Sequence, residues 1–293
     1  VKKDNFTKRY LNFARFNKKI QYSKYKIDEN HIPKNLYEKY DIFITGSDQV
    51  WNPNFGRMSD IDFLTFAPEY KRNAFSASFG ISKVPENMIE YYKFRLERFK
   101  HISVREDRGK EIIKELTGRE DIEVLVDPTM LITAEEWTKI AEKPKQLKKD
   151  KFILNYFLGE LSETRKNEIN RVAKENGCEV INILDKNNPF YEVGPSEFLY
   201  LEKNAFLICT DSFHSCVFAI LFNIPFIVFD REDNEVKMNS RLETLLKKFQ
   251  LEDRWYNGKI TKNMQKINYK NAYETLEKER KKAEKFINKI LKK

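Results

Sequence analysis

Short apolar runs alternate with longer amphipathic stretches along most of this chain, and this alternation limits its fold more than any other feature of the sequence. The runs of the first half are "DIFIT" (41–45), "RNAFSASFG" (72–80), "HISVRE" (101–106) and "IEVLVDPTMLI" (122–132). Amphipathic helical patterns separate them at 85–100 and 107–118. The order strand, helix, strand, helix, strand is typical of an α/β fold.

The alternation restarts after "AEKPKQLKKDK" (141–151), a charged stretch with a proline that we interpret as an interdomain linker. Strand patterns then occupy 152–158, 178–184, 205–210 and 225–230. Helical patterns occupy 162–177, 194–204, 215–223, 240–250 and 270–292. In the first of these helices, Ser162 is the expected N-cap and Gly177 the expected C-terminal stop.

This rhythm predicts two Rossmann-like domains that face a central cleft. The first is expected at 1–145 and the second at 150–268, with the C-terminal helix at 270–293 packing back on the first. Residues 1–40 show weak helical periodicity and no clear core element. The chain begins with Val1 rather than methionine, so we expect that an earlier segment precedes it. A length of 293 residues is sufficient for two hydrophobic cores.

The composition is that of a globular protein with a heavily charged surface: 41% of the residues are hydrophobic and 34% are charged. No window reaches the roughly 18 uninterrupted apolar residues of a membrane span. The N-terminal stretch shows no apolar core of a signal peptide. Three unclustered cysteines fit a reducing compartment and argue against a disulfide framework or a cysteine zinc site. We therefore expect a cytoplasmic protein.

A net charge of +9 indicates a preference for anionic partners. The sequence has no zinc-finger spacing, no RNP motif and no compact arginine-rich arm, so we expect no nucleic-acid partner. Much of the excess charge lies in helices where Glu and Lys alternate, as in "TLEKERKKAEKFINKILKK". Small anionic substrates or phosphate-bearing lipid head groups are the favoured partners.

The stretch "ICTDSFHSCVFAILFNIPFIVF" (208–229) holds His214, one of only three histidines. Its strand pattern ends at Thr210, and a helix is expected to begin near Ser212. His214 then lies in the first helical turn, above the carboxyl edge of the sheet, where open α/β proteins bind ligands. The helix start favours a bound anion such as phosphate or carboxylate. A histidine that simply packs or caps is the alternative.

Arg105 follows the strand pattern at 101–104 and precedes a helix, so it is expected to point into the same cleft. A guanidinium group holds a carboxylate or phosphate by two parallel hydrogen bonds. The alternative is an ion pair with an acidic neighbour in the sequence, namely Glu106, Asp107 or Glu111.

The stretch "GSDQVWNPNFG" (46–56) is a third candidate. Asp48 and Gln49 are suited to bind hydroxyl groups, and Trp51 is suited to stack on a sugar ring. A role in turn formation and packing explains these residues equally well. Asp127, in the turn "DPTML", is expected near the interdomain cleft.

Several common motifs are missing from the sequence. It contains no G-x-G-x-x-G, no P-loop, no H-E-x-x-H and no clustered His, Cys and carboxylate ligands. It also lacks the G-x-S-x-G elbow that would make Ser212 and His214 a hydrolase pair. We therefore expect neither a separate cofactor nor a bound metal.

Taken together, "YDIFITGSDQVWNP", "AFSASFG", "ISVREDRG", "VLVDPTML", "TDSFHSCVFAILFNIPFIVF" and "NSRLETLL" resemble the polysaccharide pyruvyl transferase family. They occur in that family's usual order and span about residues 40–250. The resemblance implies a fold similar to the GT-B glycosyltransferases, with an acceptor-side first domain and a donor-side second domain. It also implies transfer of a pyruvyl group from phosphoenolpyruvate to a sugar during the biosynthesis of a cell-envelope exopolysaccharide.

Carried over residue by residue, the resemblance implies that Arg105 holds phosphoenolpyruvate and that His214 lies at the reaction centre. Lys237 and Arg241, downstream of the last strand pattern, are the candidates for a further basic donor ligand. The chain differs from the family in two places. Phe213 stands where an arginine usually precedes the histidine, and the usual first strand with its Asn-Tyr-Gly-rich loop is absent.

The mechanistic hypothesis is that His214 acts as general acid or stabilises phosphate, while Asp48 orients or deprotonates an acceptor hydroxyl. The acceptor is expected to be a sugar or a lipid-linked oligosaccharide, with peripheral contact to the inner membrane surface. Two alternatives remain open: a GT-B-type glycosyltransferase that uses a nucleotide-sugar, and a non-catalytic glycan-binding protein.

Overall fold

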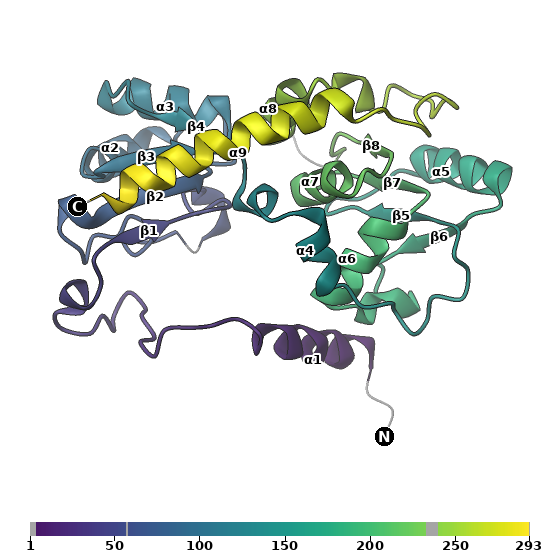
Figure 1. Cartoon of the computed structure of the whole chain (residues 1–293), viewed down its shortest axis with the longest axis horizontal. Coiled ribbons are helices and arrows are strands. Elements are labelled where there is room, and N and C mark those ends of the chain that lie inside the picture. Colours follow the sequence, from purple (N-terminus) through teal and green to yellow (C-terminus); the bar gives the residue numbers. More distant parts are fainter. Residues whose placement is uncertain (1–3, 57, 233–239, 293) are drawn as a thin grey trace. The chain divides into compact units, whose positions relative to one another are not determined.

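The computed structural model describes residues 4–56, 58–232 and 240–292, and these contain two four-stranded sheets in which every strand pairing is parallel (Figure 1). The prediction of an α/β fold is confirmed. The chain divides into two compact units, each built from three separate segments. We name each after the candidate residue that it contains, the Arg105 unit and the His214 unit.

The Arg105 unit comprises Ser23–Leu131, Met238–Phe249 and Glu274–Lys293. Its strands are β1 (Phe43–Thr45), β2 (Arg72–Ala77), β3 (His101–Val104) and β4 (Glu123–Val124), in the order β1-β2-β3-β4. Its helices are α2 (Ile89–Leu96), α3 (Asp107–Thr117), α8 (Ser240–Phe249) and the larger part of α9 (Lys270–Leu291).

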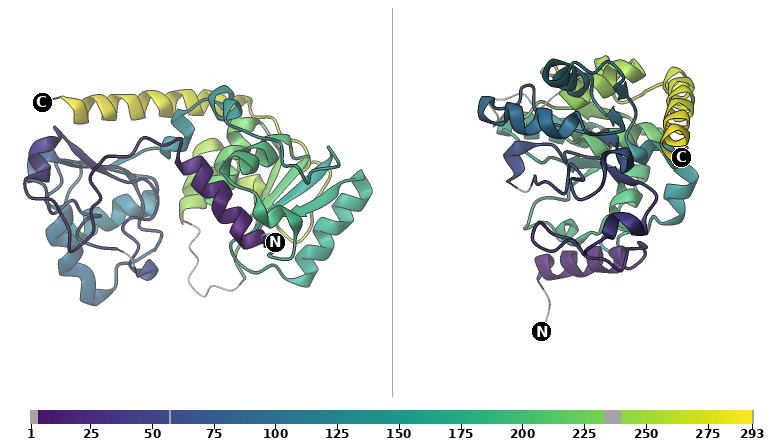
Figure 2. Two further views of the ribbon diagram at one scale, coloured as in Figure 1. Left: turned by 90° about the horizontal axis from the view of Figure 1, so that it is seen from below. Right: turned by 90° about the vertical axis from the view of Figure 1, so that its left-hand side faces the viewer.

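Two apolar clusters sandwich this sheet, as expected for parallel strands whose two faces are both covered. One cluster is aromatic: Trp51 stacks on Phe63 with ring centroids 5.8 Å apart. The other forms where α9 runs along the sheet and brings Phe286 against Phe75 of β2 (Figures 1 and 2). Every residue of β2 is buried, and its small Ser and Ala residues leave room for this packing on both faces.

The His214 unit comprises Val1–Tyr22, Ile132–Lys237 and Gln250–Tyr273. Its strands are β5 (Phe152–Tyr156), β6 (Glu179–Asn182), β7 (Leu207–Thr210) and β8 (Phe226–Val228), in the order β6-β5-β7-β8. Its helices are α1 (Asn5–Asn17), α4 (Ala134–Lys139), α5 (Glu163–Asn176), α6 (Pro195–Asn204) and α7 (Phe213–Phe222).

Helix α7 is the central helix of this unit, because eight of its ten residues are buried. It begins after Ser212 and ends at Asn223, which adopts a left-handed conformation that asparagine tolerates well. Helix α5 instead covers the sheet with one apolar side, formed by Ile169, Val172 and Ala173. Ser162 and Gly177 flank α5 as predicted, although the Ser162 hydroxyl bonds to Glu232 rather than capping the helix.

Two segments have a structure that the sequence did not suggest. Helix α1 forms near the N-terminus, where only weak periodicity was seen, and it buries none of its residues. The stretch 141–151, interpreted as a linker, lies within the His214 unit. Among the helices in the described part of the chain, none has the length and apolar composition needed to cross a membrane.

Candidate functional site

Arg105 follows β3 directly, and its side chain is entirely buried. Its guanidinium donates to the Asp127 carboxylate at 2.7 Å and to the Asp48 carboxylate at 2.8 Å. Asp127 follows β4 and Asp48 follows β1, so the contact joins three strand ends of one sheet. The sequence suggested acidic neighbours as ion-pair partners for Arg105; the structure pairs it instead with two carboxylates distant in the sequence.

The two carboxylates differ in exposure, because the Asp127 side chain is 1% exposed and the Asp48 side chain 53%. Asp48 reaches Arg105 from a sharp turn that starts at Gly46, whose φ of +112° is open only to glycine. A Cβ atom at Gly46 would lie 2.3 Å from the carbonyl oxygen of Phe75. The turn therefore requires this glycine, and it presents Asp48 at the surface end of the ion-pair cluster.

Arg241, in the first turn of α8, also belongs to this cluster. Its guanidinium lies 4.0 Å from the same Asp48 oxygen that Arg105 contacts. The side-chain amide of Gln49 is 2.7 Å from the Asn52 amide and within 3.1 Å of the Arg241 guanidinium. The structure thus brings four predicted site residues together in the Arg105 unit: Arg105, Asp48, Gln49 and Arg241.

A cavity of about 300 Å³ opens beside this cluster. Its lining residues are Asp48, Gln49, Val50, Asn52, Met58 and Asp62. Carboxylate and amide groups of this kind can bind the hydroxyl groups of a sugar. Trp51, the residue predicted to stack on the sugar, is instead fully buried between Phe63, Phe79 and Phe99, which favours the packing alternative.

Glu106 lies beneath the cluster and is completely buried. One of its carboxylate oxygens accepts hydrogen bonds from the Ser78 hydroxyl and from the amide of Phe79, both at 2.9 Å. Burial raises the pKa of Glu106, although the nearby Arg105 and Arg241 charges oppose this shift. Sequence reasoning treated Glu106 only as an ion-pair partner, and nothing in the local pattern distinguishes it from the exposed Asp107.

In the other unit, His214 occupies the first turn of α7, as predicted, and is partly exposed. Ser212 is buried at the N-cap position, where its amide donates to the Thr210 hydroxyl at 2.9 Å. Asp211 accepts hydrogen bonds from the amides of Leu158 and Gly159 at 2.7 and 2.8 Å, so it fixes the loop that follows β5.

Arg231 is a basic residue of this region that sequence reasoning did not select. Its Nε donates to the Asp211 carboxylate at 3.1 Å, close to the start of α7. Arg231 directly follows the strand pattern "PFIVFD", and a basic residue in that position could have been selected from the sequence as a candidate site residue. Lys237, predicted in the same role, lies outside the described residues.

The buried carboxyl group of Glu202 anchors the first turn of α7 through Ser215. Glu202 of α6 is fully buried, and one of its oxygens accepts a hydrogen bond from the Ser215 hydroxyl at 2.6 Å. Burial raises the pKa of Glu202 well above its usual value. The neutral form of this carboxyl is therefore favoured next to the residue that follows His214.

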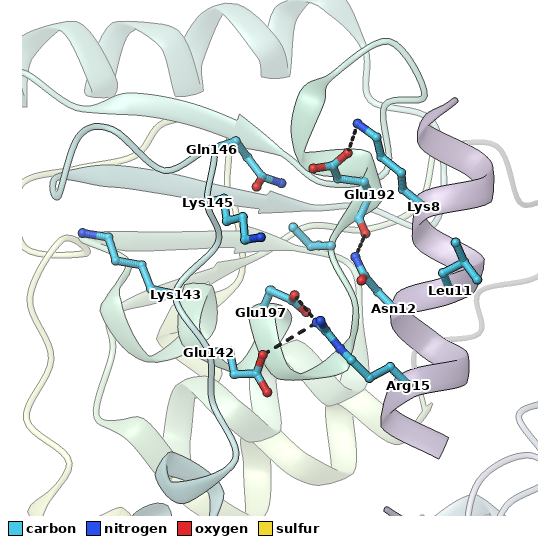
Figure 3. Close-up of a pocket in the computed structure, with 11 residues that line it drawn as sticks. Lys8, Leu11, Asn12, Arg15, Glu142, Lys143, Lys145, Gln146, Glu192 and Glu197 are labelled. Atoms are coloured by element: carbon cyan, nitrogen blue, oxygen red, sulfur yellow. Dashed lines mark hydrogen bonds and ion pairs between the residues drawn. The ribbon is translucent and has the colours of Figure 1, made fainter. Parts of the chain in front are cut away.

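A second cavity of about 260 Å³ lies between α1 and the stretch 142–146 (Figure 3). Its charged side chains largely pair with one another, as Lys8 does with Glu192 and Arg15 with Glu197. It contains none of the predicted site residues. In the described parts of the chain, no group of three or more His, Cys, Asp or Glu side chains could hold a metal ion.

The sequence was compared with those of known proteins and with models of protein families. Comparison with curated protein sequences found no match. A model of the polysaccharide pyruvyl transferase family matches residues 2–234, a range that contains Asp48, Arg105 and His214. Because this match covers most of the 293 residues, the chain belongs to the polysaccharide pyruvyl transferase family.

Proposed function

We propose that the protein transfers a pyruvyl group from phosphoenolpyruvate to a sugar of a cell-surface glycan or of its lipid-linked precursor. The family match supports pyruvyl transfer to a polysaccharide acceptor. The observation that carries the choice of donor is the pair of arginines, Arg105 and Arg241, that share one carboxylate oxygen of Asp48. Two guanidinium groups at one point suit a small ligand that bears both a carboxylate and a phosphate.

The proposed reaction joins one donor to two hydroxyl groups of the acceptor sugar. The methylene carbon of phosphoenolpyruvate gains a proton, both hydroxyl oxygens form bonds to the adjoining carbon, and phosphate leaves. One hydroxyl proton balances the new methyl group and the other leaves with the phosphate. We assign His214 to proton donation or phosphate stabilisation, and Asp48 to the acceptor hydroxyl.

The remaining predicted residues complete this assignment. Arg105, Arg241 and Lys237 would bind the donor, Ser212 would add a contact at the start of α7, and Gln49 would bind an acceptor hydroxyl. The proposal includes a GT-B-like pairing of the two domains, a cytoplasmic location and no further cofactor.

Peripheral contact with an anionic membrane surface belongs to the same proposal. Phe6 and Tyr10 lie four residues apart on α1 and are 69% and 68% exposed. Lysine and arginine residues surround them in the sequence. Exposed aromatic and basic residues on one helix are suited to bind an anionic interface, where a lipid-linked acceptor would be found.

Thermal shift and phosphate release test the donor assignment. Phosphoenolpyruvate at about 100 times its dissociation constant should add about 2.7 kcal/mol to the free energy of unfolding. His214→Ala should keep the fold and lower turnover by about 10²–10⁴-fold. Arg108→Ala, which removes an exposed ion pair with Glu115, is the matched control and should retain activity. A shift with a nucleotide-sugar but none with phosphoenolpyruvate would support a glycosyltransferase instead.

A further inference from the structure

Arg105 is bound by one buried and one exposed carboxylate. Asp127 is sealed from solvent at 1% exposure, and its Oδ1 also accepts from the Thr129 amide at 2.9 Å. Asp48 lies 2.8 Å from the guanidinium, against 2.7 Å for Asp127, but its side chain is 53% exposed. A ligand that approaches from solvent can therefore replace Asp48 without disturbing Asp127.

The Asp48 carboxylate occupies a position that suits the anionic group of a ligand. Its Oδ1 lies 2.8 Å from one nitrogen of Arg105 and 4.0 Å from Arg241. Helix α8 holds Arg241 in place, because the Thr244 hydroxyl accepts from the Asp107 amide at 3.2 Å and Lys248 pairs with Glu279 at 2.7 Å. The Arg105 guanidinium is thus held by Asp127, and Arg241 is carried by an anchored helix, while the Asp48 carboxylate lies on a turn.

Asp48 also lines the 300 Å³ cavity with Gln49, Asn52 and Asp62. The same side chain is therefore close to two arginines and to a cavity, lined by both polar and apolar side chains, of a size that can take a sugar ring. A carboxylate that loses a guanidinium neighbour accepts a proton more readily, because the nearby positive charge no longer favours its ionised form.

We propose that Asp48 is an internal substitute for the donor's anionic group, and that donor binding releases it to act on the acceptor hydroxyl. This inference rests on the proposed function. The donor carboxylate or phosphate takes the position of Asp48 Oδ1 between Arg105 and Arg241. The methylene carbon of the donor gains a proton and its double bond opens. The released Asp48 then accepts the proton of an acceptor hydroxyl in the adjacent cavity, while that hydroxyl oxygen bonds to the adjoining carbon, from which phosphate later leaves. The proton passes from Asp48 to the departing phosphate.

Two consequences separate this role from that of a structural ion pair. Asp48 competes with the donor, so removal of its charge should strengthen donor binding. Asp48 also takes part in the reaction, so the same change should slow turnover. A carboxylate that only stabilises the fold would lower stability when it is neutralised, but it would not slow turnover of the folded protein.

The experiment compares Asp48→Asn with Asp62→Asn, a control that neutralises another carboxylate of the same cavity. The dissociation constants of phosphoenolpyruvate and of inorganic phosphate are measured by calorimetry without acceptor. Asp48→Asn should lower both dissociation constants about tenfold, which corresponds to about 1.4 kcal/mol of binding free energy. The same variant should lower kcat at least about 100-fold. Asp62→Asn should leave both dissociation constants within about twofold of the wild type.

The outcomes distinguish this inference from the function on which it rests. Equal or weaker binding of both anions by a folded Asp48→Asn variant overturns the exchange role. A second outcome separates the two proposals. If Asp48→Asn binds phosphate more tightly than the wild type does, but neither protein binds phosphoenolpyruvate, the exchange role stands and the donor assignment fails. Asp62→Asn tightening both anions equally would also overturn the inference, since the effect would then come from the general charge of the cavity.

Discussion

Arg105 donates to Asp127 across 2.7 Å in a site where neither side chain is more than 1% exposed. Removal of one partner from a buried ion pair is strongly destabilising, because the remaining buried charge loses compensation. Without Asp127, Arg105 would keep only the half-exposed Asp48 as its acidic partner among these two. Asp127→Ala should therefore lower the free energy of unfolding by about 3–5 kcal/mol in urea denaturation. Glu86→Ala, which breaks the exposed pair with Lys83, should change it by less than about 1 kcal/mol. Similar losses in both variants would show that Asp127 is not essential to this cluster.

Gly80→Ala tests whether the Gln49 side chain must lie where the structure places it. A Cβ atom at Gly80 would be 1.8 Å from an atom of the Gln49 side-chain amide, and Gly80 has a φ of +62°. Gly118 has a similar φ of +73° but no atom within 4 Å of the added carbon. Gly118→Ala should therefore cost only the backbone strain, about 1 kcal/mol. Gly80→Ala should cost more only if the contacts with Asn52 and Arg241 hold the Gln49 amide in place, which is the point tested. Under the proposed role of Gln49, Gly80→Ala should also weaken acceptor binding, measured as a higher KM for the acceptor in pyruvyl transfer.

The buried Glu202 should make stability depend on pH in a defined direction. Because its pKa in the folded state is raised above 4.5, its stabilising contribution is complete below pH 4.5 and is lost as pH rises through the folded pKa. Glu202→Gln keeps an oxygen that can accept from Ser215 but cannot ionise. The variant should gain on the wild type as pH rises above 4.5, measured as the difference in Tm at each pH. If the difference in Tm between Glu202→Gln and the wild type stays constant between pH 4 and 8, the raised pKa of Glu202 is contradicted.

Helix α1 should detach from the His214 unit when salt is added. It buries no residue, and its contacts are polar: Arg9 donates to the carbonyl oxygen of Tyr191 at 2.9 Å, and Lys8 and Arg15 pair with partly exposed glutamates. Added salt screens exposed pairs. Raising sodium chloride from 50 to 500 mM (about a threefold shorter screening length) should speed amide exchange in residues 5–17. Exchange in α5, which is held by Ile169 and Val172, should stay the same.

The sequence was sufficient to predict the α/β alternation because each strand and helix carries its own pattern. The strand pattern at 101–106 corresponds to β3, and the apolar run after Ser212 corresponds to α7. Helix α1 was not predicted, because its periodicity in the sequence is weak and none of its residues is buried in a core.

The site was less predictable, since its contacts join residues that are distant in the sequence. Arg105 has three acidic neighbours nearby in the chain, but its observed partners are Asp48 and Asp127, which follow other strands. Trp51 illustrates a second limit. A tryptophan beside Asp48 and Gln49 suits a sugar platform and a hydrophobic core equally well, and only the three-dimensional packing decides between them.

The Arg105 unit is completed by a helix from late in the sequence, α8. The amide of Asp107 bonds to Thr244, 137 residues further along the chain, and Arg241 comes from the same late helix. During synthesis on the ribosome, the sheet that carries Arg105 emerges long before its second guanidinium group. A fragment that stops before residue 238 therefore cannot assemble the two-arginine cluster, however well its own strands fold. The proposed anion site accordingly depends on nearly the whole polypeptide and cannot be transferred as an N-terminal module.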